Sequence, residues 1–344
     1  MFRDFVVDKI VRENASIKSF YLKRANQEAL ERYLPGQYVT LKLKLANQQK
    51  EYTRNYTLSD SPGLGSFRLT IKREERGEVS RYLHDELKEG DCLEVSKPVG
   101  DFHLVMNNSR PVVLLSGGVG ITPMLSILEY LVNYEQDRAV YFIHSSTSKT
   151  VQPMLKRLLA LDATHKNLFL SIHHSQPASD EQKNEDYHQE GRIDKAFLQS
   201  ALPIKEMDCF LCGPVGFMED MYLHLRALGV EEDQISYEFF GGGKKLGNLA
   251  DSSGSNDNSN TFNVLFTKSN KETQWDGSQL SLLDLAEAEG LTPDFSCRMG
   301  TCSTCETSLL SGKTEYDPEP FMETSEDKIF ICCSKPVSDI EIDL

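Results

Sequence analysis

The sequence lacks a long apolar run and a secretion signal, and it is short of positive charge. No stretch approaches the ~20 consecutive apolar residues needed to cross a bilayer, and the N-terminus MFRDFVVDKIVREN has no basic segment followed by an apolar one. Lysine and arginine total 37 against 52 aspartate and glutamate, which gives a net charge of −15. This balance argues against nucleic acids and anionic membranes as partners, since both attract basic surfaces. We therefore expect a soluble cytoplasmic protein without an integral membrane segment or a nucleic-acid partner.

The negative charge is concentrated near the C-terminus. Residues 261–344 contain 6 Lys or Arg and 16 Asp or Glu, a net charge of −10, whereas the preceding 260 residues carry only −5. A small acidic module of this kind is suited to docking onto a basic surface of a partner. The other interpretation is an acidic solvated face that only keeps the chain soluble, and charge alone does not separate the two.

Cysteines are scarce in the first 200 residues and clustered near the end. The eight cysteines are Cys92, Cys209, Cys212, Cys297, Cys302, Cys305, Cys332 and Cys333. In a chain without a secretion signal, such a cluster is more often a set of metal ligands than a set of disulfides.

The pattern of apolar residues changes along the chain and predicts three domains. Residues 1–105 contain segments such as 37–45 and 66–72 in which apolar and polar residues alternate, which is typical of half-buried strands in a small antiparallel β-barrel. One short helix is expected at 80–90, with Ser80 as its N-cap and Gly90 as its end.

Residues 106–243 change to continuous apolar runs separated by helical stretches. Strands are expected at 112–116, 139–144, 167–174, 208–213 and 235–241, and helices at 123–133 and 216–230. This alternation predicts a doubly wound α/β domain with a parallel sheet. Residues 244–260 are rich in Gly, Ser and Asn and predict a flexible linker. Residues 261–344 form the third unit.

The segment CRMGTCSTC places Cys297, Cys302 and Cys305 in the spacing C-x4-C-x2-C. With a distant fourth cysteine, this is the spacing of a plant-type 2Fe-2S site, and Gly300 suits a loop that wraps closely around the cluster. Zinc sites usually pair two C-x2-C units or add histidines, and neither arrangement is present. The spacing alone leaves Cys332 and Cys333 as alternatives for the fourth ligand. Plant-type ferredoxins place it four residues before a proline, and by that resemblance Pro336 selects Cys332.

Two pairs of motifs are suited to nucleotide phosphates. RNYTLS (54–59) supplies an arginine, and GEVSRYL (77–83) supplies a helix N-terminus. SGGVGITPM (116–124) and LCGPVGF (211–217) each join a buried strand to a helix through glycines, at the carboxyl edge where open α/β sheets bind ligands. Each motif by itself is weak evidence for nucleotide binding. Arg54 can equally be a surface arginine, and Cys212 can be a small residue that only packs in the core.

Taken together and in order, R-x-Y-T, G-x-V-S, GGVGITP, CGP and YEFFG resemble the ferredoxin–NADP reductase superfamily. IKREERGEVSRYLHDELKEGD and FLCGPVGFM are most similar to the reductase half of flavohaemoglobins. The globin half has no counterpart, and a ferredoxin-like (α+β, β-grasp) segment follows instead. That order is similar to hybrid-cluster-protein reductases and several oxygenase reductases. The resemblance covers nearly the whole chain outside 244–260.

The resemblance implies a set of flavin contacts. Arg54 binds the flavin pyrophosphate, Tyr56 lies against the flavin, and Thr57 hydrogen-bonds near its reactive nitrogen. The phosphate contact at the helix N-terminus is completed by Gly77, Val79 and Ser80. The family binds FAD in this barrel.

The resemblance also implies a nicotinamide site. The residues expected to cradle the nucleotide are Gly118, Gly120 and Thr122, and those near its reactive end are Cys212, Gly213 and Pro214. Glu238 and Phe240 match a glutamate and an aromatic beside the flavin, and Phe239 is either similar or part of the core. Thr57, Cys212 and Glu238 are the expected catalytic residues.

The choice of coenzyme is read from HSSTSKT (144–150), after the second strand of the nucleotide domain. NADH enzymes often place an acid there and NADPH enzymes a basic cluster, and this segment has only hydroxyls and Lys149. The flavohaemoglobin likeness favours NADH, with NADPH as the alternative.

These parts predict a monomeric NAD(P)H-dependent reductase that converts a hydride into single electrons. Electrons are expected to pass from NADH through FAD and the 2Fe-2S cluster to a protein acceptor with a basic docking surface, such as a hybrid-cluster protein, an oxygenase or a desaturase component. In the alternative, the flavin reduces a small molecule such as free flavin, oxygen or a quinone, and the ferredoxin domain is regulatory or sensory.

Overall fold

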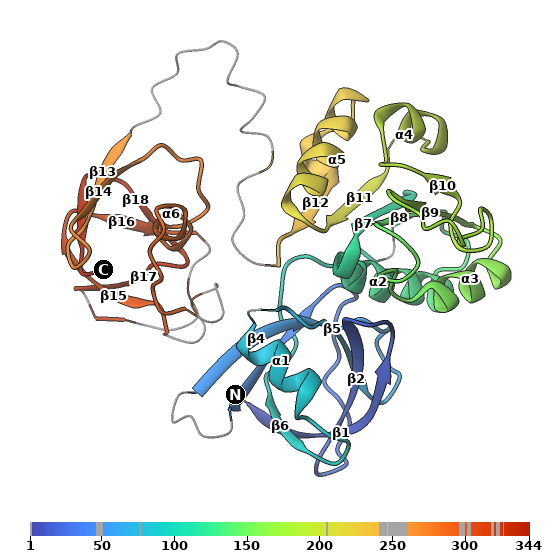
Figure 1. Ribbon diagram of the computed structural model, residues 1–344, viewed down its shortest axis with the longest axis horizontal. Helices are drawn as coiled ribbons and strands as arrows, with labels where there is room; N and C mark the ends of the chain where they lie inside the picture. Colours follow the sequence, from blue (N-terminus) through green and yellow to red (C-terminus); the bar gives the residue numbers. More distant parts are fainter. Residues whose placement is uncertain are drawn as a thin grey trace. The chain divides into compact units, whose positions relative to one another are not determined.

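The computed structural model describes residues 2–344 except 46–50, 76, 107, 204–205, 241–245, 247–260, 296–299, 301–303, 318–319, 321–323 and 326. The chain divides into two compact units, Met1–Phe240 and Gly241–Leu344, and each is described by itself (Figure 1). The predicted linker 244–260 lies outside the described residues except for Leu246, and the predicted domain boundaries remain predictions.

The first part of unit 1 is the predicted antiparallel barrel. Its strands are β1 (Arg3–Arg12), β2 (Ile17–Arg24), β3 (Tyr38–Lys44), β4 (Glu51–Thr57), β5 (Phe67–Lys72) and β6 (Cys92–Val95). They pair in the order β4-β3-β6-β1-β2-β5, and a bridge between Leu58 and Leu69 joins the two outer strands. The inward-facing residues of the alternating strands, among them Val39, Leu41 and Phe67, form one buried core.

The barrel's one helix, α1 (Glu78–Asp85), begins two residues before the predicted start. Gly77 is its N-cap, so the expectation that Ser80 caps the helix is wrong. Ser80 is inside the first turn, where its hydroxyl accepts a hydrogen bond from the Glu74 amide at 3.2 Å and lies 3.5 Å from the Gly77 carbonyl. Gly90 does not end the helix either, because it lies in a later turn with φ of +95° and donates its N–H to Val7.

The second part of unit 1 is the predicted doubly wound domain. Its elements are β7 (Val112–Gly117), η1 (Gly118–Gly120), α2 (Ile121–Tyr134), β8 (Val140–Ser146), α3 (Leu155–Thr164), β9 (Leu168–His174), β10 (Gln189–Glu190), α4 (Lys195–Ala201), β11 (Asp208–Cys212), α5 (Val215–Ala227), η2 (Glu232–Gln234) and β12 (Ile235–Glu238). The sheet is parallel with the order β10-β9-β8-β7-β11-β12. The order reverses between β7 and β11, so the two glycine turns are neighbours at the switch point, where such sheets bind ligands.

A buried polar network joins the barrel to this domain. Arg68 on β5 donates to Glu129 on α2 at 3.0 Å, and Arg157 on α3 donates to the same carboxylate oxygen at 3.0 Å. The Ser126 hydroxyl donates to the Asp60 carbonyl at 2.7 Å, and Tyr33 donates to the Asp60 carboxylate at 2.9 Å. Burial raises the pKa of Asp60 to about 6, although the neighbouring guanidinium of the network opposes this. The network joins the two folds of unit 1 through groups that are buried, except for the exposed Arg157.

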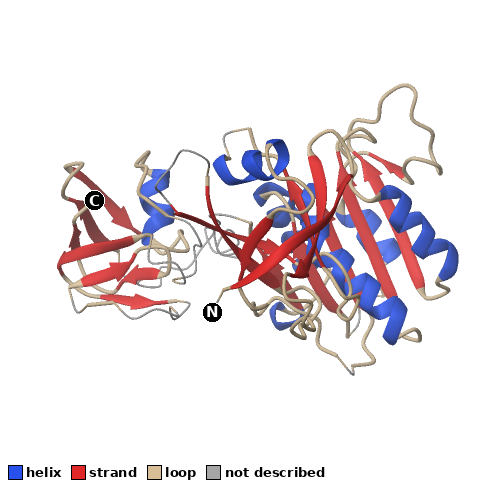
Figure 2. Cartoon of the chain, turned by 90° about the horizontal axis from the view of Figure 1, so that it is seen from below, coloured by secondary structure: helices blue, strands red, loops and turns tan. Residues whose placement is uncertain are grey.

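Unit 2 has the α+β architecture expected of a ferredoxin domain. Its elements are β13 (Phe262–Phe266), β14 (Lys271–Trp275), α6 (Leu282–Ala288), β15 (Glu306–Ser311), β16 (Thr314–Tyr316), β17 (Lys328–Phe330), β18 (Ser334–Pro336) and β19 (Ile340–Ile342). Five strands pair in the order β14-β13-β19-β15-β17, and β16 pairs with β18 (Figure 2). Helix α6 begins at an N-cap, Ser281, whose hydroxyl accepts from the Asp284 amide, and its Leu282 and Leu285 enter the core.

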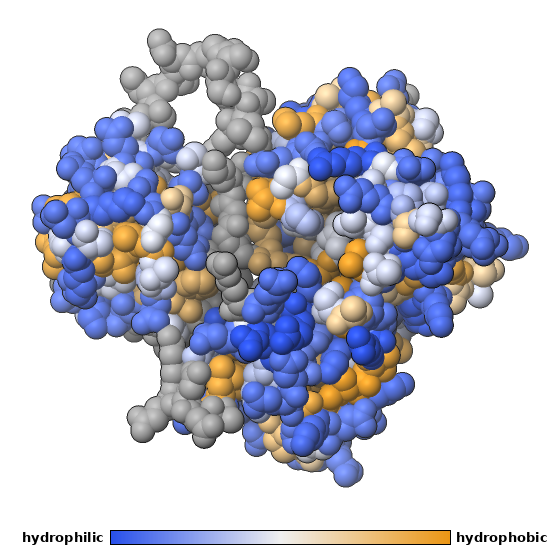
Figure 3. All heavy atoms as spheres, viewed as in Figure 1, coloured by the Kyte–Doolittle hydropathy of each residue, from blue (hydrophilic) through white to orange (hydrophobic). Residues whose placement is uncertain are grey.

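No helix in the described part of the chain is both long and apolar enough to span a membrane. The face drawn in Figure 3 is mainly polar, with apolar side chains in separate small areas.

Candidate functional site

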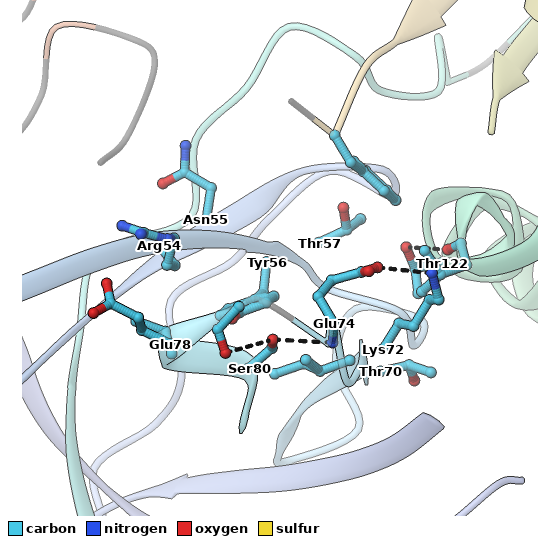
Figure 4. Close-up of a pocket in the computed structure, with 15 residues that line it drawn as sticks. Arg54, Asn55, Tyr56, Thr57, Thr70, Lys72, Glu74, Glu78, Ser80 and Thr122 are labelled. Atoms are coloured by element: carbon cyan, nitrogen blue, oxygen red, sulfur yellow. Dashed lines mark hydrogen bonds and ion pairs between the residues drawn. The ribbon is translucent and has the colours of Figure 1, made fainter. Parts of the chain in front are cut away.

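A cavity of about 350 Å³ lies where the barrel meets the carboxyl edge of the parallel sheet (Figure 4). It is lined by Arg54, Asn55, Tyr56, Thr57, Thr70, Ile71, Lys72, Glu74, Gly77, Glu78, Val79, Ser80, Val119, Thr122 and Phe240. The structure therefore brings together all the predicted flavin contacts of 54–57 and 77–80 with Thr122 and Phe240. We call this cavity the flavin pocket.

One end of the flavin pocket is suited to phosphate. Arg54 on β4 is half-buried, donates to the Thr53 carbonyl at 2.8 Å and lies 6.0 Å from the centre of the Tyr52 ring. The N-terminus of α1 opens at Gly77 beside it, where the first amides of a helix lack intrahelical acceptors and attract anions. A side chain at Gly77 would collide with the Ser80 hydroxyl. Arginine and helix N-terminus together fit the pyrophosphate of FAD.

The other end of the flavin pocket is aromatic and apolar. Tyr56 lines it, and burial raises the pKa of its phenol, which keeps the ring neutral. Thr57 is buried next to it, and Phe240 is 49% exposed. Phe239 instead packs edge-on against Tyr237 at 5.7 Å and is half-buried, and it lines neither cavity. These surfaces fit a flat ring system, with the exposed side chain of Phe240 at its boundary.

Cys212 and Glu238 are neighbours at the ends of adjacent strands, because β11 and β12 pair them directly. Cys212 is fully buried, and burial, followed by the Glu238 charge, raises the pKa of its thiol. Burial also raises the pKa of Glu238 to about 8, and its Oε2 is buried without a hydrogen-bond partner among the described residues. A carboxyl group in this setting is protonated at neutral pH and can hold a proton at the edge of the sheet.

If hydride is transferred at this edge, as the resemblance implies, we expect Glu238 to give that step a pH dependence near 8. Its pKa is raised above the ordinary value of 4.5, so the buried group is neutral below about 8, and the stability it contributes is lost as pH rises through that value. The rate of flavin reduction by NADH, followed by stopped-flow absorbance, should change between pH 7 and 9 in the wild type and lose that step in Glu238→Gln. An unchanged profile in the variant would assign the step to another group.

A second cavity of about 520 Å³ lies along the same edge of the sheet. It is lined by Ser16, Ile17, Lys72, Gly117, Gly118, Val119, Ser145, Ser146, Thr147, Val151, Ser175, Arg192, Ile193, Pro214, Gly216, Phe217, Asp220 and Met221. Of the predicted nicotinamide contacts, Gly118 and Pro214 are in this set. Gly118 has φ of +54° and open space where a side chain would point, as a backbone that approaches a dinucleotide requires. We call this cavity the nucleotide pocket.

Gly120, Cys212, Gly213 and Glu238 line neither cavity. A side chain at Gly120 would collide with the carbonyl of Cys212, so this glycine allows the two turns to pack against each other. A Cβ on Gly213 would lie 2.8 Å from the Phe217 ring and 3.0 Å from the Gly117 amide. These residues therefore pack next to the turns that form the pockets, without lining either cavity.

Sequence reasoning missed several lining residues. Lys72 lines both cavities and forms an ion pair with Glu74 at 2.8 Å, and Glu78 accepts from Tyr52 at 3.2 Å. The sequence contained a clue to both residues, because Lys72 ends a predicted strand and Glu78 belongs to the predicted phosphate motif GEVS. Arg192 had no signal, since it lies 42 residues beyond the segment that carries the coenzyme motif.

The cluster site can be examined at two of its four predicted ligands. Cys305 and Cys332 are buried, whereas Cys297 and Cys302 lie outside the described residues. The Gly300 N–H points to the Cys332 Sγ at 3.3 Å, and Gly300 has φ of +61°, which favours glycine. Cys333 is fully buried and its Sγ lies 3.5 Å from the Phe330 carbonyl. A thiol that receives a backbone N–H in this way suits a 2Fe-2S ligand, the role predicted for Cys332.

Comparison with known families agrees with the three parts of the fold. The "Oxidoreductase FAD-binding domain" matches residues 4–104, the "Oxidoreductase NAD-binding domain" residues 114–222, and the "2Fe-2S iron-sulfur cluster binding domain" residues 266–337.

Several known proteins are similar to 70% of this chain. A flavohemoprotein of Bacillus cereus is 40% identical over 245 residues and one of Halalkalibacterium halodurans 41% over 246, each covering 70% of this chain. The chain spans only about 61% and 60% of their lengths. The flavohem-like FAD/NAD binding domain of nitric oxide dioxygenase from Vibrio cholerae is 33% identical with a TM-score of 0.64, covering 70% of this chain and 98% of that one.

Solved structures also match the whole length of the chain, and one of them is described here. It is a phthalate dioxygenase reductase, 22% identical with a TM-score of 0.61, covering 100% of this chain and 98% of that one. The chain belongs to the ferredoxin–NADP reductase superfamily, as a flavohaemoglobin-type reductase module followed by a 2Fe-2S ferredoxin domain, and is an NAD(P)H-dependent flavin and iron–sulfur oxidoreductase with FAD, NADH and a 2Fe-2S cluster as cofactors.

Proposed function

We propose that this chain passes the electrons of NADH one at a time to a separate redox protein. The proposal rests on one observation: a single chain contains the flavin pocket, the nucleotide pocket and a domain in which Cys305 and Cys332 are buried. The phthalate dioxygenase reductase with the same fold is described as a modular structure for electron transfer from pyridine nucleotides to [2Fe-2S]. FAD accepts two electrons as a hydride and releases them singly, which suits a one-electron 2Fe-2S cluster.

The residues of unit 1 bind and orient the cofactors. Arg54 and the α1 N-terminus hold the flavin pyrophosphate, and Tyr56 lies against the ring. Gly118 and Pro214 let the nicotinamide nucleotide approach the backbone at the switch point. Phe240, which lines the flavin pocket and is 49% exposed, would cover the open side of a bound flavin and yield that place to the nicotinamide.

Three residues form the catalytic edge. Thr57 in the flavin pocket donates a hydrogen bond at the reactive side of the ring. Cys212 is a neutral thiol, because burial keeps it protonated, and it would support from behind the turn that the nicotinamide approaches. Glu238 holds a proton next to it, on the oxygen that has no partner among the described residues.

Unit 2 delivers electrons to a protein with a basic surface. Residues 261–344 carry a net charge of −10, which is complementary to such a surface and unfavourable for an acidic one. A hybrid-cluster protein, an oxygenase or a desaturase component fits this requirement. The reductase acts as a monomer, so one chain carries the full path.

We expect the rate of acceptor reduction to fall steeply with salt. At ionic strengths near 0.15 M the screening length is about 8 Å, so the long-range attraction between unit 2 and a basic partner weakens. The second-order rate constant for reduction of a basic one-electron protein such as cytochrome c, measured between 10 and 500 mM NaCl, should drop at least tenfold. Reduction of ferricyanide in the same buffers is the control for general salt effects. A rate that is indifferent to salt would contradict the charged docking surface.

The competing function is reduction of a small molecule at the flavin, with a regulatory or sensory ferredoxin domain. Flavohemoproteins are similar to this chain over only 70% of its length, so the likeness does not depend on a ferredoxin domain. This similarity keeps small-molecule reduction as the second candidate function. Removal of the cluster through Cys332→Ser decides between the two. The relay loses reduction of a one-electron protein and keeps NADH-driven bleaching of the flavin, whereas a small-molecule reductase keeps both.

A further inference from the structure

The nucleotide pocket has one wall from each fold of unit 1. Ser16, Ile17 and Lys72 line it from the barrel, where Ile17 on β2 pairs with Lys72 on β5. Segment 147–151, which follows β8 and which we call the β8 loop, lines it from the parallel-sheet domain, with Val151 as its last residue. A ligand that fills this pocket contacts both walls, so its affinity depends on how the walls are held together.

Asn14 joins the two walls. Its Nδ2 donates a hydrogen bond to the Val151 carbonyl at 3.1 Å, across 137 positions of the chain. Asn14 lies in the turn between β1 and β2, two residues before the lining residue Ser16, and Val151 lies in the β8 loop. The hydrogen bond therefore connects a hairpin of the barrel directly to the loop that forms the opposite wall.

The hairpin itself fixes the direction of the Asn14 amide. The Asn14 Oδ1 accepts from the backbone N–H groups of Ser16 and Ile17 at 2.9 Å each. Only the oxygen of the amide can accept from these two donors, so the nitrogen must be on the other side of the group. An asparagine that closes a turn with its oxygen in this way presents its NH₂ group in one defined direction, which here is toward Val151.

The two ends of the β8 loop are held by different folds. Within the parallel-sheet domain, the Lys149 N–H donates to the Glu181 carboxylate at 2.9 Å. At the end of the loop, the side chain of Val151 is 41% exposed, and its carbonyl receives the hydrogen bond from Asn14. Because packing against so exposed a side chain is weak, the contact from the barrel is what restrains this end of the loop.

We propose that Asn14 is a positioning residue for the nicotinamide coenzyme: it holds the β8 loop to the barrel, so that the nucleotide pocket is formed before the coenzyme binds. This inference rests on the proposed binding of NADH in that pocket. Without the donor, the loop and the hairpin separate more often, and the coenzyme must order them again, which lowers its affinity. Asn14 lines neither cavity, so the chemistry at the flavin is left as it is.

The test uses the full chain with its cofactors and two variants that lose the donor but keep an acceptor for the turn. Asn14→Asp keeps an oxygen for the two backbone N–H groups, and Asn14→Ser does so without adding a charge and is too short to reach Val151. The dissociation constant of NAD⁺, measured by calorimetry, should rise about threefold to tenfold in both variants, as expected for one neutral hydrogen bond. The matched control is Asn26→Ser, at an exposed asparagine of the barrel whose Oδ1 accepts from the Glu28 N–H at 3.2 Å, and it should change nothing.

Two further measurements separate positioning from a general loss of structure. The KM for NADH should rise by a similar factor in both variants, while kcat and the urea midpoint of unfolding stay at the wild-type values. In the absence of coenzyme, backbone amides of residues 147–152 should exchange their hydrogens faster in both variants than in the wild type.

Equal NAD⁺ affinity in the wild type and both variants would overturn the role of Asn14 while the pocket assignment stands. Weaker binding in Asn14→Asp alone would overturn it too, because the added charge would then be the cause. A fall in kcat or in the urea midpoint together with the affinity would mean a structural defect instead of positioning. If the wild type neither binds NAD⁺ nor has its flavin reduced by NADH, the proposed function of the pocket fails and the inference with it.

Discussion

Replacing Cys332 with serine is expected to abolish the 2Fe-2S cluster, while the same change at the adjacent Cys333 leaves it in place. Cys332 is the thiol that receives the Gly300 N–H at 3.3 Å, and Cys333 is packed against Phe330 in the hydrophobic core. A cluster ligand must be a thiolate, and backbone N–H groups stabilise that charge. Cys332→Ser should lose the visible absorption and the electron paramagnetic resonance signal of the reduced cluster, together with at least 99% of one-electron protein reduction.

The paired variant makes this result specific. Cys333→Ser changes the same atom type one residue away, so it controls for damage to the fold of unit 2. Both variants should keep FAD and the rate of flavin reduction by NADH. A cluster that survives in Cys332→Ser and is lost in Cys333→Ser would assign the fourth ligand to Cys333. Protein reduction that persists without a cluster would reject the relay.

Replacing Glu129 with alanine is expected to destabilise unit 1 by about 3–5 kcal/mol. Glu129 is 1% exposed and accepts from Arg68 and Arg157 at 3.0 Å each, and Arg68 is itself 6% exposed. Removal of the carboxylate leaves the Arg68 charge buried without its main counter-charge. Asp60 remains as a second counter-charge, but its carboxylate already accepts from the Tyr33 hydroxyl and from the Arg68 backbone N–H.

Urea unfolding followed by flavin fluorescence measures this effect. The control is Asp85→Ala, which removes a solvent-exposed partner of Arg73 in the same unit and should leave the midpoint nearly where it is. Because the pair joins the barrel to the nucleotide domain, Glu129→Ala should also release FAD at a lower urea concentration than the wild type. A loss of under about 1 kcal/mol would mean that Arg68 reaches water or another acid when Glu129 is gone.

Local patterns in the sequence were enough to predict the architecture of each domain. Alternation at 37–45 and 66–72 predicted strands, and continuous apolar runs predicted strands buried on both faces, since side chains on a strand point to opposite faces. The expectation that the alternating strands are half-buried is wrong, because their polar face is buried as well, at Thr40, Arg68 and Thr70. The family matches confirm the FAD, NAD and 2Fe-2S domains that these patterns and the cysteine spacing predicted. Such features are local because each depends on a few successive residues.

The helix start at Glu78 and the capping of α1 were not predictable in this way. Ser80 is a good N-cap residue by type, and only the loop from Glu74 decides that its hydroxyl turns back toward the chain before the helix. Similarly, Gly120 reads as a phosphate-contacting glycine, but its role is set by the approach of the Cys212 carbonyl from a strand 92 residues away.

The sequence by itself determined that the chain has a barrel, a parallel nucleotide-binding sheet and a cysteine-rich module, because periodicity and spacing are written in consecutive residues. Tertiary structure decided which distant groups meet. It paired Arg68 with Glu129, brought Arg192 to the nucleotide pocket, and turned the Gly300 amide toward the Cys332 thiol. Each of these depends on strand order and turns across tens of residues, and no local pattern encodes where such turns lead.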